Sequence, residues 1–244
     1  MEVHHHSGGH QGPKHFKDYF QEFLMIFLAV TMGFLAENIR EYITDNNHVV
    51  ELVGQLKEDL VNDTANIQNL ISRLTIQMGR TDSLYELLIE PGKQKDFIRI
   101  QELIKTSDNL NVFYPSTGAI STIKTELHLK RFVKTKIASH IDNYEKKISV
   151  LHEVEIRDIE YMGKVLEAFM SKHFTPENAA ATVNQRPFIN GELRNLADED
   201  LIQLSVDINL VKAYNRQLLY RCIEIKSDAV AFIQHINTTY GLED

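Results

Sequence analysis

Apolar residues recur with helical spacing along most of the chain, and this pattern predicts three long helices. Between residues 49 and 88 the apolar positions are separated mostly by steps of three, four or seven, which marks one buried helical face. A second pattern of this kind runs from about residue 121 to about residue 172, and a third from about residue 198 to residue 240. Amphipathic helices bury such faces most simply against one another, so the sequence predicts an antiparallel bundle.

Irregular segments separate these patterns. A proline at position 91 ends the first pattern, and residues 96–105 predict a short amphipathic helix after it. Residues 107–118 predict a loop, because turn-forming residues are frequent there. We expect the aromatic pair Phe113 and Tyr114 in this loop to cover the end of the core.

At three places the sequence does not decide between alternative secondary structures. Residues 45–47, Asp-Asn-Asn, either form a hinge with a new helix N-terminus or lie within one continuous helix. The second apolar pattern exceeds 50 residues without a proline, so either a break lies inside it or it forms a coiled-coil-like arm. Residues 174–197 form the largest irregular segment, and Thr175-Pro176 predicts a turn in it.

A more apolar stretch precedes the first amphipathic pattern. Its uninterrupted part, residues 23–36, would span only about 21 Å as a helix, whereas the hydrocarbon core of a bilayer is about 30 Å thick. Aromatic and aliphatic residues on both sides extend it to residues 16–39, which is about 36 Å and sufficient to cross with some tilt. No small-residue cleavage site follows. We therefore predict a membrane anchor, with a buried helix of a soluble fold as the alternative.

The charges around this stretch bear on how it would lie in a membrane. Glu22 must sit near the interface, stay protonated or face a partner helix. Lys14 and Lys17 precede the stretch, whereas Arg40 is followed by Glu41. This bias favours a cytoplasmic N-terminus and an external body, which in a bacterium means a single-pass protein of the inner membrane with a periplasmic body.

These patterns together define the expected organisation. Residues 1–15 are a flexible, histidine-rich tail, residues 16–44 the membrane-anchoring helix, and residues 45–244 the bundle domain. The predicted fold class is all-α: an N-terminal transmembrane helix followed by an elongated antiparallel bundle of about three long helices plus one short helix.

The composition of the chain argues against several kinds of function and of site. The net charge is −8, with 34 acidic and 26 basic residues, which argues against a general nucleic-acid binder because phosphate neutralisation needs a basic surplus. The single cysteine, Cys222, excludes an internal disulfide and a multi-cysteine metal site. Because Cys222 falls on the apolar face of the third pattern, we expect a small core residue rather than a nucleophile.

Candidate chemistry is sparse. His128, His140 and His152 are spaced by 12 residues, about 18 Å along a helix, which is too far to share a metal ion. Several carboxylates on the predicted helices loosely resemble the ligands of a di-iron bundle, but the helices that would face Glu155 carry no Glu-x-x-His pair, so we expect a solvated charged face; these residues are Glu58, Asp59, Asp63, Glu155, Glu224 and Asp228. We therefore predict no enzyme, and no catalytic, cofactor-binding or metal-binding residue.

Residues 22–30, EFLMIFLAV, and residues 37–41, ENIRE, carry a resemblance to known proteins. Following a histidine-rich opening, they resemble the anchor of single-span helical proteins frequent in Bacteroidota. The resemblance covers about 30 residues and implies membrane attachment and bacterial origin. It implies no activity, cofactor or catalytic residue.

Two hypotheses for function follow. The first is a membrane-anchored helical scaffold or protein-interaction module, whose partners are the lipid bilayer through residues 16–39 and either a second copy or another membrane protein. The alternative is an extracytoplasmic ligand-sensing bundle that works with a partner protein. In that case residues 107–118 and 174–197 should meet over a concave site.

Overall fold

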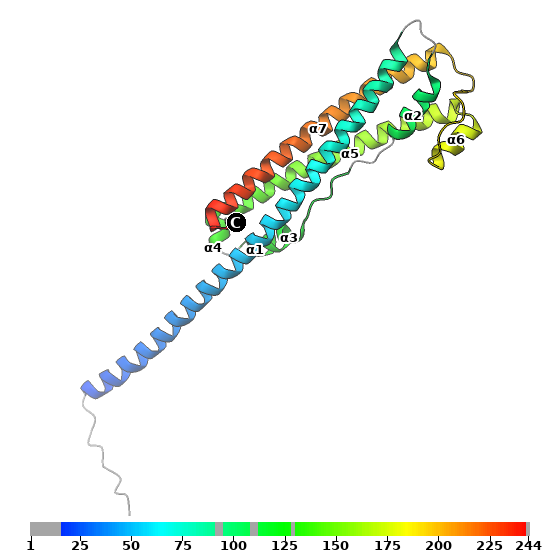
Figure 1. Ribbon diagram of the computed structural model, residues 1–244. Coiled ribbons are helices and arrows are strands. Elements are labelled where there is room, and N and C mark those ends of the chain that lie inside the picture. The colour runs from blue at the N-terminus through cyan, green and yellow to red at the C-terminus, as the bar shows by residue number, and fades with distance from the viewer. Residues whose placement is uncertain (1–15, 91–94, 108–111, 128–129, 243–244) are drawn as a thin grey trace, which may run out of the picture. The chain divides into compact units, whose positions relative to one another are not determined.

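A computed structural model describes residues 16–90, 95–107, 112–127 and 130–242, and these are all-helical (Figure 1). They contain no strand, only one isolated antiparallel bridge between Phe174 and Leu193. The predicted all-α class is confirmed. The helices are α1 (Phe16–Ile89), α2 (Phe97–Ser107), α3 (Gly118–Thr125), α4 (Lys130–Thr135), α5 (Ile137–His173), α6 (Pro176–Val183) and α7 (Asp198–Tyr240).

Helix α1 is continuous over 74 residues. It passes through residues 45–47, so the hinge alternative is wrong. Asn and Asp cost at most about 0.7 kcal/mol each in a helix interior, which the flanking turns outweigh. The helix ends at Ile89, two residues before Pro91, as a proline requires. Contact density divides the chain into two units, Met1–Val50 and Glu51–Asp244.

Within the second unit, α7 runs antiparallel to α5. Two hydrogen bonds fix the register: the Tyr161 hydroxyl donates to Asp207 Oδ1 at 3.0 Å, and Lys172 Nζ donates to Asp200 Oδ1 at 2.5 Å. Nearer the other end, Lys147 pairs with Asp228. These contacts join α5 and α7 along most of their lengths.

The second half of α1 lies against α7, also antiparallel. Lys212 Nζ pairs with Asp82 Oδ1 at 2.7 Å, and Lys226 Nζ donates to Gln68 Oε1 at 2.6 Å. The apolar faces between the helices are fully buried, and each such Leu or Ile contributes about 1.5–3 kcal/mol. The largest fully buried aliphatic side chains of α1 and α2 include Leu56, Leu60, Ile67, Leu70, Leu74, Leu84, Ile100 and Ile104.

The second apolar pattern is divided among several helices. Of the two alternatives, the break inside the pattern is confirmed. The chain forms α3, then α4, then α5, and Lys136 between α4 and α5 adopts a left-handed conformation with φ 57°. In the preceding loop the predicted pair divides: Phe113 is buried and enters the core, whereas Tyr114 is 78% exposed and does not.

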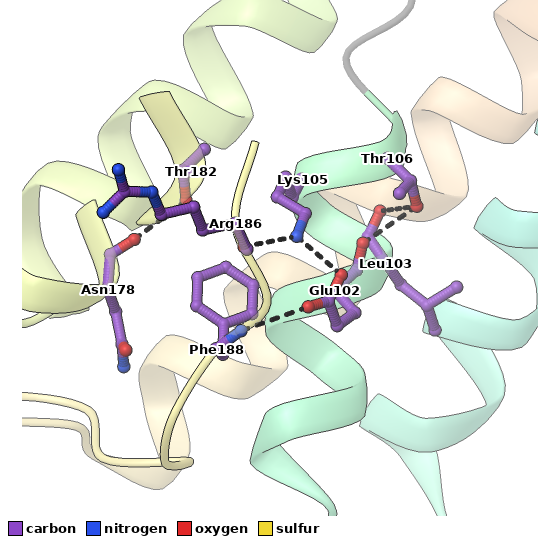
Figure 2. Close-up of polar contacts among 8 residues, drawn as sticks. All are labelled: Glu102, Leu103, Lys105, Thr106, Asn178, Thr182, Arg186 and Phe188. Atoms are coloured by element: carbon purple, nitrogen blue, oxygen red, sulfur yellow. Dashed lines mark hydrogen bonds and ion pairs between the residues drawn. The ribbon is translucent and has the colours of Figure 1, made fainter. Parts of the chain in front are cut away.

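The segment predicted to be irregular, residues 174–197, contains helix α6. Thr175 caps it, because its Oγ1 accepts a hydrogen bond from Asn178 N–H at 3.2 Å, and Pro176 occupies the first turn. The prediction of a simple turn at Thr175-Pro176 is therefore wrong. Figure 2 shows how the chain after α6 lies on α2, where Lys105 Nζ donates to the Arg186 carbonyl at 3.0 Å and Phe188 N–H donates to Glu102 Oε1 at 3.4 Å.

Candidate functional site

The side chains between residues 16 and 43 form an exposed apolar surface. Helix α1 holds an 18-residue window with a mean hydropathy of 1.6, of which 0% is buried. Met25 and Phe34 are 68% and 69% exposed. By length and composition this segment can cross a bilayer. Such a surface marks a site of contact with lipid or with another protein.

A second feature is a row of carboxylates that holds the extended chain before α3. Ser116 N–H donates to Asp63 Oδ1 at 2.8 Å, and Ala119 N–H donates to Asp59 Oδ2 at 3.2 Å. From α5, Glu155 Oε1 accepts the N–H of Phe113 at 2.8 Å. The carboxylates thus satisfy backbone donors of the extended segment and of the first turn of α3, which have no acceptor within a helix or sheet.

Asp63 has both of its oxygens engaged, because the Tyr144 hydroxyl donates to Oδ2 at 2.8 Å. Burial raises the pKa of Asp63 above its usual value, against the lowering effect of the Ser116 and Tyr144 hydrogen bonds. Burial, followed by the charge of Asp63, also raises the pKa of Tyr144, so this hydroxyl keeps its proton. The pair joins α1 to α5 and holds the backbone of Ser116 against α1.

The prediction of a solvated face is wrong for Asp63 and Glu155, which are 0% and 1% exposed. Glu155 Oε2 also contacts His152 Nδ1 at 2.7 Å. Cys222 is buried, as expected for a core residue. Burial, with a further contribution from Glu155, raises the pKa of the Cys222 thiol to about 12, and a protonated thiol is a poor nucleophile.

The predicted histidines lie at separate levels of the fold. His140 stacks on Phe232 with ring centroids 5.0 Å apart, and it lies tilted against His235 at 4.4 Å. His173 Nδ1 lies 3.0 Å from the carbonyl oxygen of Arg194. His128 and the histidines of the tail lie outside the described residues. Over the described part of the chain, no group of three or more His, Cys, Asp or Glu side chains could hold a metal ion.

Two shallow grooves follow the seam between α5 and α7. One, of about 240 Å³, includes Lys147 and Glu224, which pair with each other at 3.1 Å. The other, of about 290 Å³, includes Tyr161 and Asp207, which are hydrogen-bonded. No residue of segment 107–118 lines either groove. The concave loop site of the sensing hypothesis therefore has no counterpart in these two grooves.

The outer face of α7 is an exposed apolar surface that the sequence reasoning missed. Large apolar side chains stand exposed on it, between 41% and 63%, and they are Ile202, Val206, Leu210, Tyr220, Ile223 and Val230. The signal was present in the sequence as a second apolar series, offset by about half a turn from the series that is buried.

Neither a protein-family model, nor a curated protein, nor a solved structure matches the chain. The resemblance of residues 22–30 and 37–41 to single-span Bacteroidota proteins therefore stays a prediction. Two surfaces of the described residues expose large apolar side chains, residues 16–43 and the outer face of α7.

Proposed function

We propose that this chain is a membrane-anchored helical scaffold or protein-interaction module. In this proposal residues 16–39 cross the bilayer once, and an antiparallel bundle of the later helices offers surfaces to other proteins. The exposure of the apolar side chains along residues 16–43 carries the proposal. Exposing apolar surface to water costs about 25 cal/mol per Å², so lipid is the solvent that suits this segment.

The proposed location is the bacterial inner membrane, with the N-terminus in the cytoplasm and the body in the periplasm. The flanking charges support this orientation. Two lysines, Lys14 and Lys17, stand at the N-terminal end of residues 16–39, and one arginine, Arg40, follows directly at the C-terminal end. Orientation follows the count of Lys and Arg rather than the net charge, and this count is greater on the N-terminal side.

We propose no catalytic role. The ionic groups described in the two α5–α7 grooves pair with one another, and Asp63 and Glu155 accept backbone hydrogen bonds. The same pairing gives the ligand-sensing alternative less support, because a sensor needs polar groups that converge on a ligand.

Membrane fractionation of the full chain tests the anchor. The wild-type protein should stay in the membrane fraction through an alkaline carbonate wash and leave it only with detergent. A double variant, Phe27→Asp with Leu28→Asp, should lose this behaviour, because each charge at the centre of a membrane helix costs about 2.5–3.5 kcal/mol.

The matched control places the same charges on exposed apolar positions of α1 outside the segment. Val61→Asp with Ile76→Asp replaces side chains that are 46% and 58% exposed, and membrane retention should be unchanged. Extraction of the wild-type chain by carbonate without detergent would refute the anchor.

A further inference from the structure

Residues 127–141 form a basic stretch in an acidic chain. They contain four lysine or arginine residues and no aspartate or glutamate, whereas the whole chain has a net charge of −8. The four are Lys130, Arg131, Lys134 and Lys136, and we call residues 127–141 the basic segment. A local surplus of positive charge attracts anionic partners, and its position in the fold decides which of them it meets.

The body holds the basic segment beside the C-terminal end of α7 (Figure 1). Phe132 is 0% exposed and fastens α4 to the core. Thr135 Oγ1 lies 2.6 Å from Tyr240 Oη, and the Arg131 guanidinium lies 4.8 Å from the centre of the Tyr240 ring. The position of the basic segment at this end of the body is therefore fixed by its own contacts.

Two charges of the basic segment are available to a partner outside the chain. Lys134 and Lys136 are exposed, and neither has an ion-pair partner among the described residues. Lys147 differs, because it pairs with Asp228 on α7. An ammonium group without an ion-pair partner keeps its charge towards the solvent, so these two lysines can bind an anionic group.

The end of the body that carries the basic segment is also the end at which the chain enters the body. Lys57 Nζ donates to the Leu242 carbonyl at 2.6 Å, so the start of the body lies beside the end of α7. Leu52 is 4% exposed and already belongs to the core. It follows Ile39, the last residue of the proposed span, by 13 residues of the continuous helix α1, which is about 20 Å.

A bilayer crossed by residues 16–39 would bring lipid headgroups within reach of the basic segment. The headgroup region on each side of the hydrocarbon core is about 5–8 Å thick, and charges act over about 8 Å of solution at physiological ionic strength. The length of a lysine side chain and the tilt of a membrane helix cover the remaining few ångströms. The connecting stretch itself repels an anionic surface, since it contains Glu41, Asp45 and Glu51. The attraction therefore depends on the basic segment.

We infer that the basic segment binds the headgroups of anionic phospholipids in the membrane that residues 16–39 cross. This inference rests on the proposed anchor and adds a second contact with the same membrane. Anionic headgroups such as that of phosphatidylglycerol carry a phosphate whose charge no amine balances, and each lysine near such a surface strengthens binding about fivefold. The contact turns one end of the body towards the bilayer and leaves its other faces for protein partners.

The lipid selectivity of the full chain in detergent tests this contact. The chain is purified in a neutral detergent with equal amounts of phosphatidylglycerol and phosphatidylcholine, and the lipids that elute with it on gel filtration are quantified. Phosphatidylglycerol should be enriched on the wild-type chain at low salt, and high salt should reduce the enrichment because it screens exposed charges. Lys134→Gln with Lys136→Gln should lower the enrichment by about fivefold or more.

Arg157→Gln with Lys164→Gln is the matched control. Both residues are exposed and lie on α5, about 30 Å and 40 Å beyond Lys136. The control should keep the enrichment of the wild-type chain, and both double variants should keep its circular dichroism spectrum and its unfolding temperature in detergent without added lipid. Equal binding of the two lipids by the wild-type chain, or an enrichment that the Lys134 and Lys136 substitutions do not change, overturns the inference.

Two further measurements separate the lipid contact from a phosphate site and from the anchor. Inorganic phosphate should release no more phosphatidylglycerol than sodium chloride of the same ionic strength, and a much greater release would indicate a phosphate site and overturn the inference. The variant with Lys134→Gln and Lys136→Gln should stay in the membrane through the carbonate wash, because its apolar segment is unchanged. A wild-type chain that resists carbonate but shows no lipid preference refutes the lipid contact alone, whereas one that carbonate extracts refutes the anchor.

Discussion

Asp158 and Asn215 are buried polar residues of the bundle core. Asp158 on α5 is 6% exposed and Asn215 on α7 is 0% exposed. The pairs Lys147–Asp228 and Tyr161–Asp207 lie on either side of them along the α5–α7 seam, so the two residues occupy the same level. Asp158 Oδ1 and both side-chain polar atoms of Asn215 have no hydrogen-bond partner. Each such atom is destabilising, typically by about 1–3 kcal/mol.

Replacing Asp158 by Asn should therefore stabilise the fold at neutral pH. Burial raises the pKa of Asp158 from 3.8 to about 6, so the folded state binds the proton more tightly than the unfolded state does. The stability of the wild-type protein should fall as pH rises from about 4 to about 6 and stay reduced above that. Asn carries no charge at any pH, so Asp158→Asn should gain up to about 3 kcal/mol at pH 7, at roughly 1.4 kcal/mol per pKa unit.

Urea unfolding between pH 4 and pH 7 measures this difference. The gain of Asp158→Asn over wild type should shrink towards zero near pH 4, where the wild-type carboxyl is protonated in the folded state. Glu160→Gln, which removes the same charge from an exposed position of α5, should show no such trend. An equal gain at both ends of the pH range would show that ionisation of Asp158 is not its cause.

The burial of apolar residues could be predicted from the sequence, whereas the burial of polar residues could not. The spacing of leucines and isoleucines is local information, and it identified the buried faces of α1 and α7. Asp63 and Glu155 are buried because their partners are backbone N–H groups of Ser116 and Phe113. Those partners are 53 and 42 residues away in the sequence, so no local pattern predicts these contacts.

At the scale of elements, α7 was predicted with its observed bounds, residues 198–240. Both ends carry local signals. Three acidic residues occupy the first turn, where they complement the helix dipole, and Asp200 Oδ2 accepts the N–H of Ala197 at 3.0 Å. The helix stops at Gly241, which has φ 67° and tolerates the left-handed conformation that ends many helices.

The break between α4 and α5 had no such signal. It falls at Lys136, within the sequence Lys-Thr-Lys-Ile, which contains neither glycine nor proline. Tertiary contacts set it, because Thr135, just before the break, binds α7 on both sides: its Oγ1 lies 2.6 Å from Tyr240 Oη, and its carbonyl oxygen lies 2.9 Å from His235 Nε2. Sequence spacing could place a break in this pattern but not locate it.

Lys136→Gly should stabilise the protein. A left-handed conformation costs a residue with a side chain about 1–2 kcal/mol, and glycine avoids this cost while losing about 0.5–1 kcal/mol of chain entropy. The expected net gain is about 0.5–1 kcal/mol, measured as a shift in the urea midpoint at unchanged slope. Lys136→Ala, which removes the charge but keeps the strain, should not stabilise. A larger gain from Ala than from Gly would mean that the lysine side chain, rather than the backbone, is unfavourable.

At the scale of the whole molecule, the two units differ in where their apolar side chains lie. In Glu51–Asp244 the apolar side chains form a core, and the cluster around Leu84, Ile104 and Phe174 is almost fully buried. Between residues 16 and 43 the large apolar side chains are exposed. The sequence analysis placed the limit of the anchor at residue 44, and the structure divides the chain at Val50. One continuous helix carries the chain across this limit, so no turn marks it in the sequence.

This distribution predicts that removing residues 1–44 makes the chain soluble without detergent but leaves its folding stability nearly unchanged. A chain beginning at residue 45 should be soluble without detergent, because it lacks the exposed apolar surface of residues 16–43. Its unfolding temperature should lie within about 2 °C of that of the full chain in the same detergent, since stability follows buried area and residues 51–244 bury their own core. Calorimetry of both chains in one mild detergent makes the comparison, and removal of residues 1–15 alone is the control, which should still need detergent. The unfolding temperature could instead fall by more than about 5 °C on removing residues 1–44, with no fall on removing residues 1–15. Residues 16–44 would then stabilise the body by packing against it, and the hypothesis of a lipid-facing anchor would be wrong.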